Sequence, residues 1–205
     1  MTEWSAPQSD ARGSRHLTAW LASLVHNRDY AKLAELRRPK TNDAHIEAGW
    51  KGPDEHREIY ERVAFLFGIY HQGRSVPSYG KGSLGAAAAR IGDGIGRGPR
   101  NPGAQLLLSR VVSSRRIPWR HLQHTITRLR SCDQAPPSWT QLTEDLTRWH
   151  DRRARVAYGW SVDFHHPQKN HSAQTHQIPQ THQIPQTDDT PQPATGPTTE
   201  KDSHA

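Results

Sequence analysis

Hydrophobic positions near the start of the chain recur with the period of an amphipathic helix. They stand at i, i+3, i+4, i+7 and i+8, and this spacing predicts a helix that begins near Ser14. The residues at these positions are Leu17, Trp20, Leu21, Leu24 and Val25. A second helix is expected over 30–38, with Asp29 as its N-cap, and Pro39 ends it because the residue before a proline is pushed out of the helical region.

The apolar pattern is densest in the middle of the chain. Residues 40–53 are mostly polar and are expected to form a loop, and a longer helix is expected over 54–71. This helix is charged through Arg62 and then apolar on every side over 63–70. Because a helix that is apolar all round must be buried, it is predicted to run through the centre of the fold.

Proline, glycine and capping residues divide the second half of the chain into shorter helices. Ser83 is expected to cap an alanine-rich helix over 84–91, and the glycine-rich segment 92–99 is expected to be a flexible connector. Four more helices are predicted. Two follow the expected N-caps Asn101 and Ser138, and the other two begin near Pro118 and Arg152. No alternating run of β-branched residues occurs. The pattern therefore predicts an all-α fold, a single helical bundle of about seven or eight helices.

Composition separates a basic folded part from its ends. Residues 169–205 are rich in Gln, Thr, His and Pro, and they repeat the sequence THQIPQ. Such a segment has too little apolar surface to order itself, so we expect disorder over 1–13 and 167–205 around a helical domain over 14–166. The tail carries two lysines and four acids, so residues 1–168 hold a net charge of +9, against +7 for the whole chain.

The sequence contains no apolar run of about 20 residues that would span a bilayer, and its first residues are too polar for a signal peptide. The protein is therefore expected to be cytoplasmic. The single Cys132 excludes an internal disulfide and any zinc site built on several thiolates.

Charge is distributed unevenly within the folded part. Between Asp93 and Asp133 there are eight arginines but no lysine, aspartate or glutamate. These arginines are Arg97, Arg100, Arg110, Arg115, Arg116, Arg120, Arg128 and Arg130. Solvated helix surfaces normally mix both signs, because like charges repel, so this run favours an anionic partner. Nucleic acid and an anionic membrane surface both satisfy this requirement, and a genome rich in GC would also favour arginine codons.

Part of the basic run lies on one side of a predicted helix. In the helix that begins at Pro118, Arg120, His124 and Arg128 stand at i, i+4 and i+8, away from the apolar stripe. Such a row places side chains about 6 Å apart, a spacing that a phosphate backbone can follow. No base-reading motif is present, so contact with the nucleic-acid backbone is the better interpretation.

Each candidate motif for an enzyme or a metal site in the sequence is incomplete. The glycines of 92–98 break the GxGxxG pattern at Arg97 and follow a helix rather than a strand. His121 and His124 share a helical face, but no carboxylate or thiol near them in sequence completes a metal site. The sequence thus predicts no catalytic residue, no metal site and no cofactor. The tail histidines His171, His176 and His182 are interpreted as part of a spacer.

Several short motifs occur in an order that resembles the CasB family, the small subunit of the type I-E CRISPR surveillance complex called Cascade. The similarity covers about residues 14–166, and the glycine-rich 92–98 and the tail depart from it. The motifs that carry it are Phe65–His71, Gly82–Gly85, Leu106–Leu108 through Arg115, Pro118-Trp119, Trp139 with Leu142, Asp145-Leu146, Arg148-Trp149 and Asp163-Phe164.

The resemblance implies a non-catalytic subunit that is present in two copies, beside CRISPR RNA, target DNA and the other Cascade subunits, with no membrane. It would stabilise the R-loop, including the displaced strand, through sequence-blind phosphate contacts. The basic positions to which the resemblance assigns this role are Arg37, Arg38, Arg110, Arg115, Arg116, Arg120, Arg128, Arg152 and Arg153.

Other interpretations stay open at this point. A stand-alone, sequence-blind DNA-binding or regulatory protein would bind duplex without partners, and its affinity would fall by about 10³–10⁵ between 50 and 200 mM salt if it neutralised ~6–10 phosphates. A metal-dependent nuclease built on the histidines would cleave labelled nucleic acid. At Arg37 and Arg38, attraction to the helix macrodipole explains the charge equally well.

Overall fold

The computed structural model describes residues 6–166, with side chains from residue 11 onwards. Within these residues the chain forms nine α-helices and no strand, so the all-α prediction is confirmed. The expectations for residues 1–5 and for the tail from 167 lie outside the described residues. The helices are α1 (Ala6–His26), α2 (Tyr30–Leu36), α3 (Asp43–Gly49), α4 (Arg57–Tyr70), α5 (Leu84–Ala88), α6 (Pro102–Val112), α7 (Trp119–Ser131), α8 (Trp139–Thr147) and α9 (Val156–His165).

Side-chain caps fix where most of these helices begin. In each case the cap oxygen accepts a hydrogen bond from the third N–H that follows it, which satisfies a donor without a partner inside the helix. The caps of α2, α5, α6 and α8 lie at residues that the sequence predicted. They are Asp29, Ser83, Asn101 and Ser138.

Four local predictions differ from the structure. The segment 40–53, expected as a polar loop, contains α3, which is capped by the Asn42 side chain. Its buried residues include Ala44, His45 and Ala48 but no large apolar side chain, so no apolar stripe marked it in the sequence. Two helices also begin elsewhere than predicted. α1 begins at Ala6 rather than near Ser14, and α9 begins at Val156 rather than near Arg152, so Arg152 and Arg153 lie in the loop before it. The glycine-rich connector forms 3₁₀ turns over Gly94–Gly96 and Gly98–Arg100.

Hydrogen bonds hold this connector against the helices on either side of it. The Gly98 N–H donates to the Ile91 carbonyl at 2.8 Å, and the Asn101 side-chain amide donates to the Gly96 carbonyl at 3.0 Å. The segment therefore has a defined path between α5 and α6, and it is not the loose linker that its glycine content indicated.

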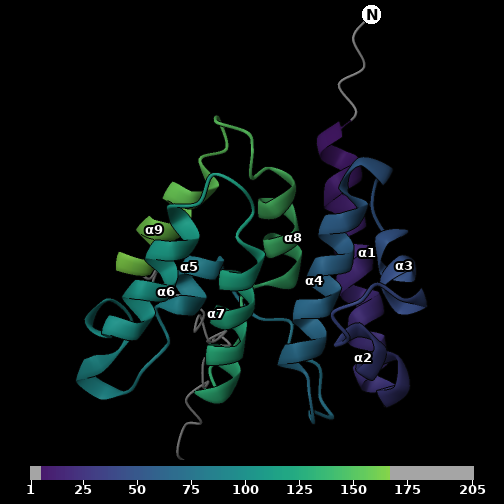
Figure 1. Ribbon diagram of the computed structural model, residues 1–205, viewed down its shortest axis with the longest axis horizontal. Coiled ribbons are helices and arrows are strands. Elements are labelled where there is room, and N and C mark those ends of the chain that lie inside the picture. Colours follow the sequence, from purple (N-terminus) through teal and green to yellow (C-terminus); the bar gives the residue numbers. More distant parts are fainter. Residues whose placement is uncertain (1–5, 167–205) are drawn as a thin grey trace, which may run out of the picture. The chain divides into compact units, whose positions relative to one another are not determined.

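The α4 helix lies at the centre of the fold, as its apolar composition predicted. It packs against α1, α2 and α3 on one side and against α7 and α8 on the other. Figure 1 shows α1, α2 and α3 on one side of α4, and α5, α6 and α9 beyond α7. The central position of α4 therefore links the two groups of helices through one continuous core.

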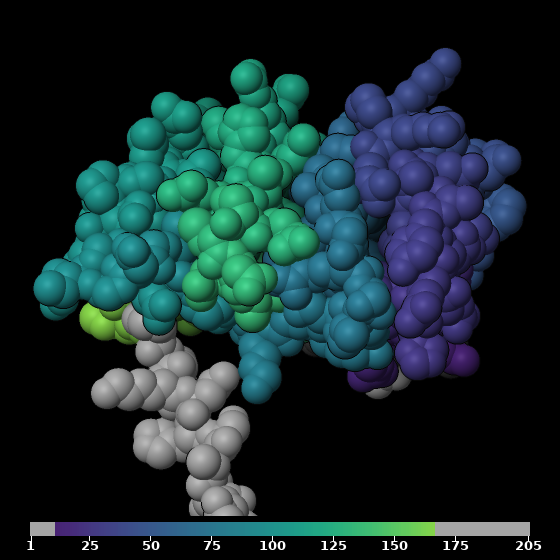
Figure 2. Space-filling model, turned by 90° about the horizontal axis from the view of Figure 1, so that it is seen from below, coloured from purple at the N-terminus to yellow at the C-terminus, as the bar shows by residue number. Residues whose placement is uncertain are grey.

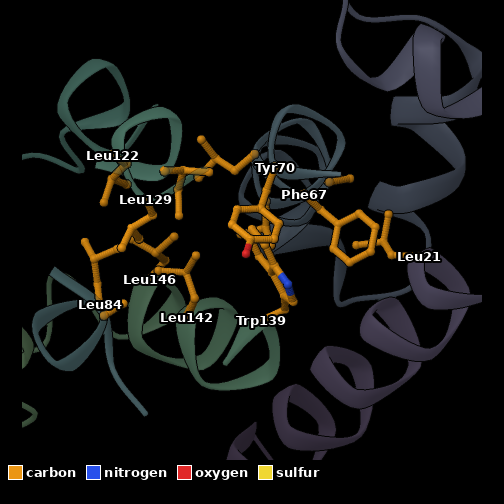
Figure 3. Packing of buried hydrophobic residues seen from close by; sticks show 14 of the residues in the cluster. Leu21, Phe67, Tyr70, Leu84, Leu122, Leu129, Trp139, Leu142 and Leu146 are labelled. Atoms are coloured by element: carbon orange, nitrogen blue, oxygen red, sulfur yellow. The ribbon is translucent and has the colours of Figure 1, made fainter. Parts of the chain in front are cut away.

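Trp139 joins α8 to α4 within this core (Figure 3). Its side chain is fully buried, with ring centroids 5.2 Å from Phe67 and 6.0 Å from Tyr70. The indole N–H donates to the Ser78 carbonyl at 2.8 Å. His71 packs beside these rings, and burial lowers its pKa to about 4, so the imidazole is neutral at physiological pH.

The other end of the fold depends on close contact between α5 and α9. Gly85 faces the backbone of Trp160, and a Cβ at Gly85 would lie only 2.6 Å from the Trp160 carbonyl carbon. The hydroxyl of Ser83 donates to the Asp163 carboxylate at 2.5 Å and so joins the N-cap of α5 to α9. This contact sets where α9 lies, and hence where the loop preceding it is placed.

Candidate nucleic-acid interface

The amphipathic pattern of α7 is confirmed. Leu122, Ile126 and Leu129 are fully buried, and Trp119 is partly buried against the core. Arg120, His124 and Arg128 are exposed on the opposite side of the helix. Figure 2 shows α7 as the green surface between the teal segment of α6 and the blue and purple N-terminal helices. The basic row therefore faces solvent, with no acidic residue on its own helix.

Salt bridges distinguish the arginines that are paired with an acid within the fold from those that have no acidic partner. Arg130 belongs to the acid-free run, but it lies 3.8 Å from the Asp133 carboxylate and donates to the Gln72 carbonyl at 3.3 Å. Asp133 is also paired with Arg74. Among the described residues, none of the nine predicted contact arginines has such an acidic partner. Their charges are thus free to attract an external anion.

Two basic segments that are far apart in the sequence meet at one pocket. The loop between α6 and α7 contributes Arg115, and the loop between α8 and α9 contributes Arg152 and Arg155. Together with Ser114, Trp149, His150, Asp151, Val156, Ala157 and Tyr158 they line a pocket of about 790 Å³. Figure 1 shows the two loops side by side. We call this feature the arginine pocket.

Local hydrogen bonds shape both loops around the arginine pocket. The Ser114 hydroxyl donates to the Arg116 carbonyl at 2.6 Å, and the Arg153 N–H donates to the Asp151 carboxylate at 2.8 Å. Arg116 and Arg153 are exposed but do not line the pocket. Arg155, which belongs to the same basic segment of the sequence as Arg152 and Arg153, does line it. The packing of the two loops decides which arginines of this segment reach the pocket.

The remaining predicted residues lie elsewhere. Arg110 is exposed in the last turn of α6. Arg37 and Arg38 follow α2, which packs against α1, α3 and α4. A Cβ at Gly68 would lie 3.3 Å from Cγ of Arg37, so the stem of this half-buried arginine packs on α4. Arg37 and Arg38 thus form a separate basic cluster from the arginine pocket.

An aromatic pair lies beside the arginine pocket, and one of its members, Trp149, lines the pocket. The half-buried Trp149 packs against Trp160, with ring centroids 5.3 Å apart. The Trp160 indole donates to the Asp145 carboxylate at 2.6 Å. Burial raises the pKa of Asp145 from 3.8 to about 6, although the hydrogen bond from Trp160 and the charge of Arg148 oppose this shift.

Replacing Asp145 by asparagine should reveal this buried carboxyl as a pH-dependent difference in stability. The folded state binds the proton more tightly, so the carboxyl favours folding below about pH 4 and loses this contribution as the pH rises through about 6. Asparagine keeps an acceptor for Trp160 but does not titrate. Relative to the wild type, the free energy of unfolding of D145N should therefore increase by about 2 kcal/mol between about pH 4 and pH 7. Urea denaturation of both proteins at the two pH values tests this, and a constant difference would contradict it.

The histidines of α7 do not extend into a larger cluster of metal ligands. The rings of His121 and His124 are 6.4 Å apart at their centroids. Within residues 11–166, no group of three or more His, Cys, Asp or Glu side chains is placed so that it could hold a metal ion. In the same part of the chain, no helix is long and apolar enough to cross a bilayer.

The helical fold has a counterpart among solved structures. The crystal structure of CasB from Thermobifida fusca matches it with a TM-score of 0.57 and 15% sequence identity. The match covers 76% of this chain and 97% of that chain. At this identity the likeness defines the fold alone, an all-α fold of the CasB type. No curated protein sequence matches the chain.

The sequence itself identifies the family. Residues 32–165 match the family described as CRISPR-associated protein Cse2. This span is well over half of the chain, and the chain therefore belongs to the CasB, or Cse2, family. Membership makes it a Cascade subunit in CRISPR defence, with the other Cascade subunits as partners. The family resemblance inferred from the ordered motifs is confirmed.

Proposed function

We propose that this chain is the non-catalytic, nucleic-acid-binding small subunit of a type I-E Cascade and is present there in two copies. It contacts the phosphate backbones of CRISPR RNA and target DNA and stabilises the R-loop, including its displaced strand. The observation that carries this proposal is the exposed, unpaired arginine surface formed by the arginine pocket and the outer row of α7.

Sequence-blind contacts of this kind suit an R-loop. Exchange of a DNA duplex for an RNA–DNA heteroduplex is close to balanced in free energy, so a few phosphate contacts are enough to shift it. Base pairing supplies the specificity, which agrees with the lack of a base-reading motif in the chain. Arginine is well suited to the role because its planar guanidinium binds a phosphate through two hydrogen bonds.

Charge reversal along α7 and the adjacent loop should weaken nucleic-acid binding by the assembled complex. In the triple variant R116E/R120E/R128E, loss of three phosphate contacts should make the slope of log affinity against log salt for a single strand less negative by about 2. DNA interference by the complex should also decrease. The measurements are binding of target DNA by the reconstituted complex over a salt series, and interference in cells.

A matched variant separates local contact from general charge. Arg12, Arg15 and Arg28 are also exposed, but they belong to α1 and the turn after it. R12E/R15E/R28E changes the net charge of the chain by the same amount, so a nonspecific loss of attraction would affect both triple variants equally. Unchanged interference by R116E/R120E/R128E would overturn the proposed function.

A further inference from the structure

The chemistry of the arginine pocket goes beyond that of a basic surface. Three exposed arginines, Arg115, Arg152 and Arg155, converge on it from two loops. The one carboxylate in the lining, Asp151, already accepts the Arg153 N–H. A volume of about 790 Å³ lies within the range of about 300–1,000 Å³ that is typical of small-ligand sites. The pocket is therefore concave, positively charged and large enough for one nucleotide.

An aromatic side chain stands at the same pocket. Tyr158 in the first turn of α9 is 58% exposed, a large fraction for an aromatic residue in a folded domain. The guanidinium carbon of Arg155 lies 4.3 Å from the centre of its ring. One face of the tyrosine is thus covered by a cation, and this contact orients the ring. An exposed, oriented aromatic ring beside arginines is the combination with which proteins stack unpaired bases.

The backbone at Arg155 is also unusual. Arg155 has φ 47° and ψ 39°, a left-handed conformation that is unfavourable for a residue with a side chain. Strain of this kind tends to persist where function requires it. Here it directs Arg155 onto Tyr158 and begins α9 without a side-chain cap, so the first N–H groups of α9 stay available to an anion.

We propose that the arginine pocket binds one unpaired nucleotide of a single strand, with its base stacked on Tyr158 and its phosphate held by Arg115 and Arg152. This inference rests on the proposed function and specifies it further. A duplex keeps its bases stacked inside, where Tyr158 has no access to them. Phosphate contact alone would make no use of the tyrosine ring, so the ligand is single-stranded.

The first test compares a strand that carries bases with a strand of the same length that carries none. The full-length chain is titrated with a short single-stranded oligonucleotide and with an abasic version of it. Stacking contributes about 1–3 kcal/mol per base, so the wild type should prefer the intact strand by about 5- to 150-fold. Y158F should keep this preference because phenylalanine also stacks, whereas Y158A should lose it. Tyr79, which is 57% exposed and outside the arginine pocket, provides the control, and Y79A should behave as the wild type.

A second test uses the reconstituted complex. Target DNA carrying photoreactive 5-bromouracil is crosslinked by ultraviolet light, and the attached peptides of this chain are identified by mass spectrometry. We expect a crosslink to the first turn of α9 that is weakened in Y158A. Crosslinks elsewhere on the chain but none there, or an intact-strand preference that survives in Y158A, would overturn the inference and leave the proposed function standing. The absence of any crosslink to this chain would overturn both.

Discussion

Replacing Gly85 by alanine should destabilise the fold by at least about 3 kcal/mol. The added Cβ would meet the backbone of Trp160, 2.6 Å from its carbonyl carbon and 2.8 Å from its Cα, whereas real Cβ atoms essentially never approach within 3.0 Å. Because backbone atoms have no rotamer with which to move aside, α5 and α9 must separate. Thermal or urea unfolding of G85A against the wild type measures the loss.

The same substitution in the facing helix provides a control of opposite sign. Gly159 in α9 is exposed, and a Cβ there would find no atom within 4 Å. G159A should therefore be more stable by up to about 1 kcal/mol, because alanine favours a helix over glycine. A G85A protein as stable as the wild type would show that α5 and α9 do not pack as closely as described.

Truncation of Trp139 to alanine should cost about 3–5 kcal/mol, as expected for the loss of a fully buried large aromatic side chain. The change removes the packing against Phe67 and Tyr70 and leaves the Ser78 carbonyl without its donor. W139F separates these effects, because it retains most of the ring but loses the indole N–H. Its cost should be smaller, at about 1–3 kcal/mol, and due mainly to the unpaired carbonyl.

Trp50 provides the reference for Trp139. It is 67% exposed, so W50A should change the free energy of unfolding by no more than about 0.5 kcal/mol. Equilibrium unfolding in urea compares the three variants on the same scale. If W139A and W50A were equally stable, Trp139 would not connect α4 to α8 as the structure places it.

Helix prediction succeeded where the evidence was local. The caps at Asp29, Ser83, Asn101 and Ser138 were predicted correctly because a cap acts on an N–H only three residues away. The apolar run over 63–70 also predicted the central α4, because a helix that is buried on all sides needs apolar residues on all sides. Prediction failed at α3, whose inner face is made of small side chains and His45.

The candidate interface was predictable only in part. The exposed row of Arg120, His124 and Arg128 followed from the helical period, which relates residues four positions apart. The structural role of Arg130 did not follow from this period. Its acidic partner, Asp133, comes after the arginine run, and Gln72, whose carbonyl accepts its hydrogen bond, lies 58 residues away. Contact of the predicted arginines with nucleic acid stays a prediction, to be tested by the charge-reversal variants.

By itself the sequence determined the helical class, most helix starts, the family and the excess of arginine over residues 94–132. Each of these depends on residue type and on short spacings, which packing does not alter. Tertiary structure alone decided that Arg115 meets Arg152 and Arg155 beside Tyr158. The physical reason is that the two loops are brought together by the packing of α6 against α7 and α9, and by the close approach of Gly85 to Trp160 that positions α9. No short spacing in the sequence predicts this arrangement of side chains, because the arrangement depends on how whole helices pack.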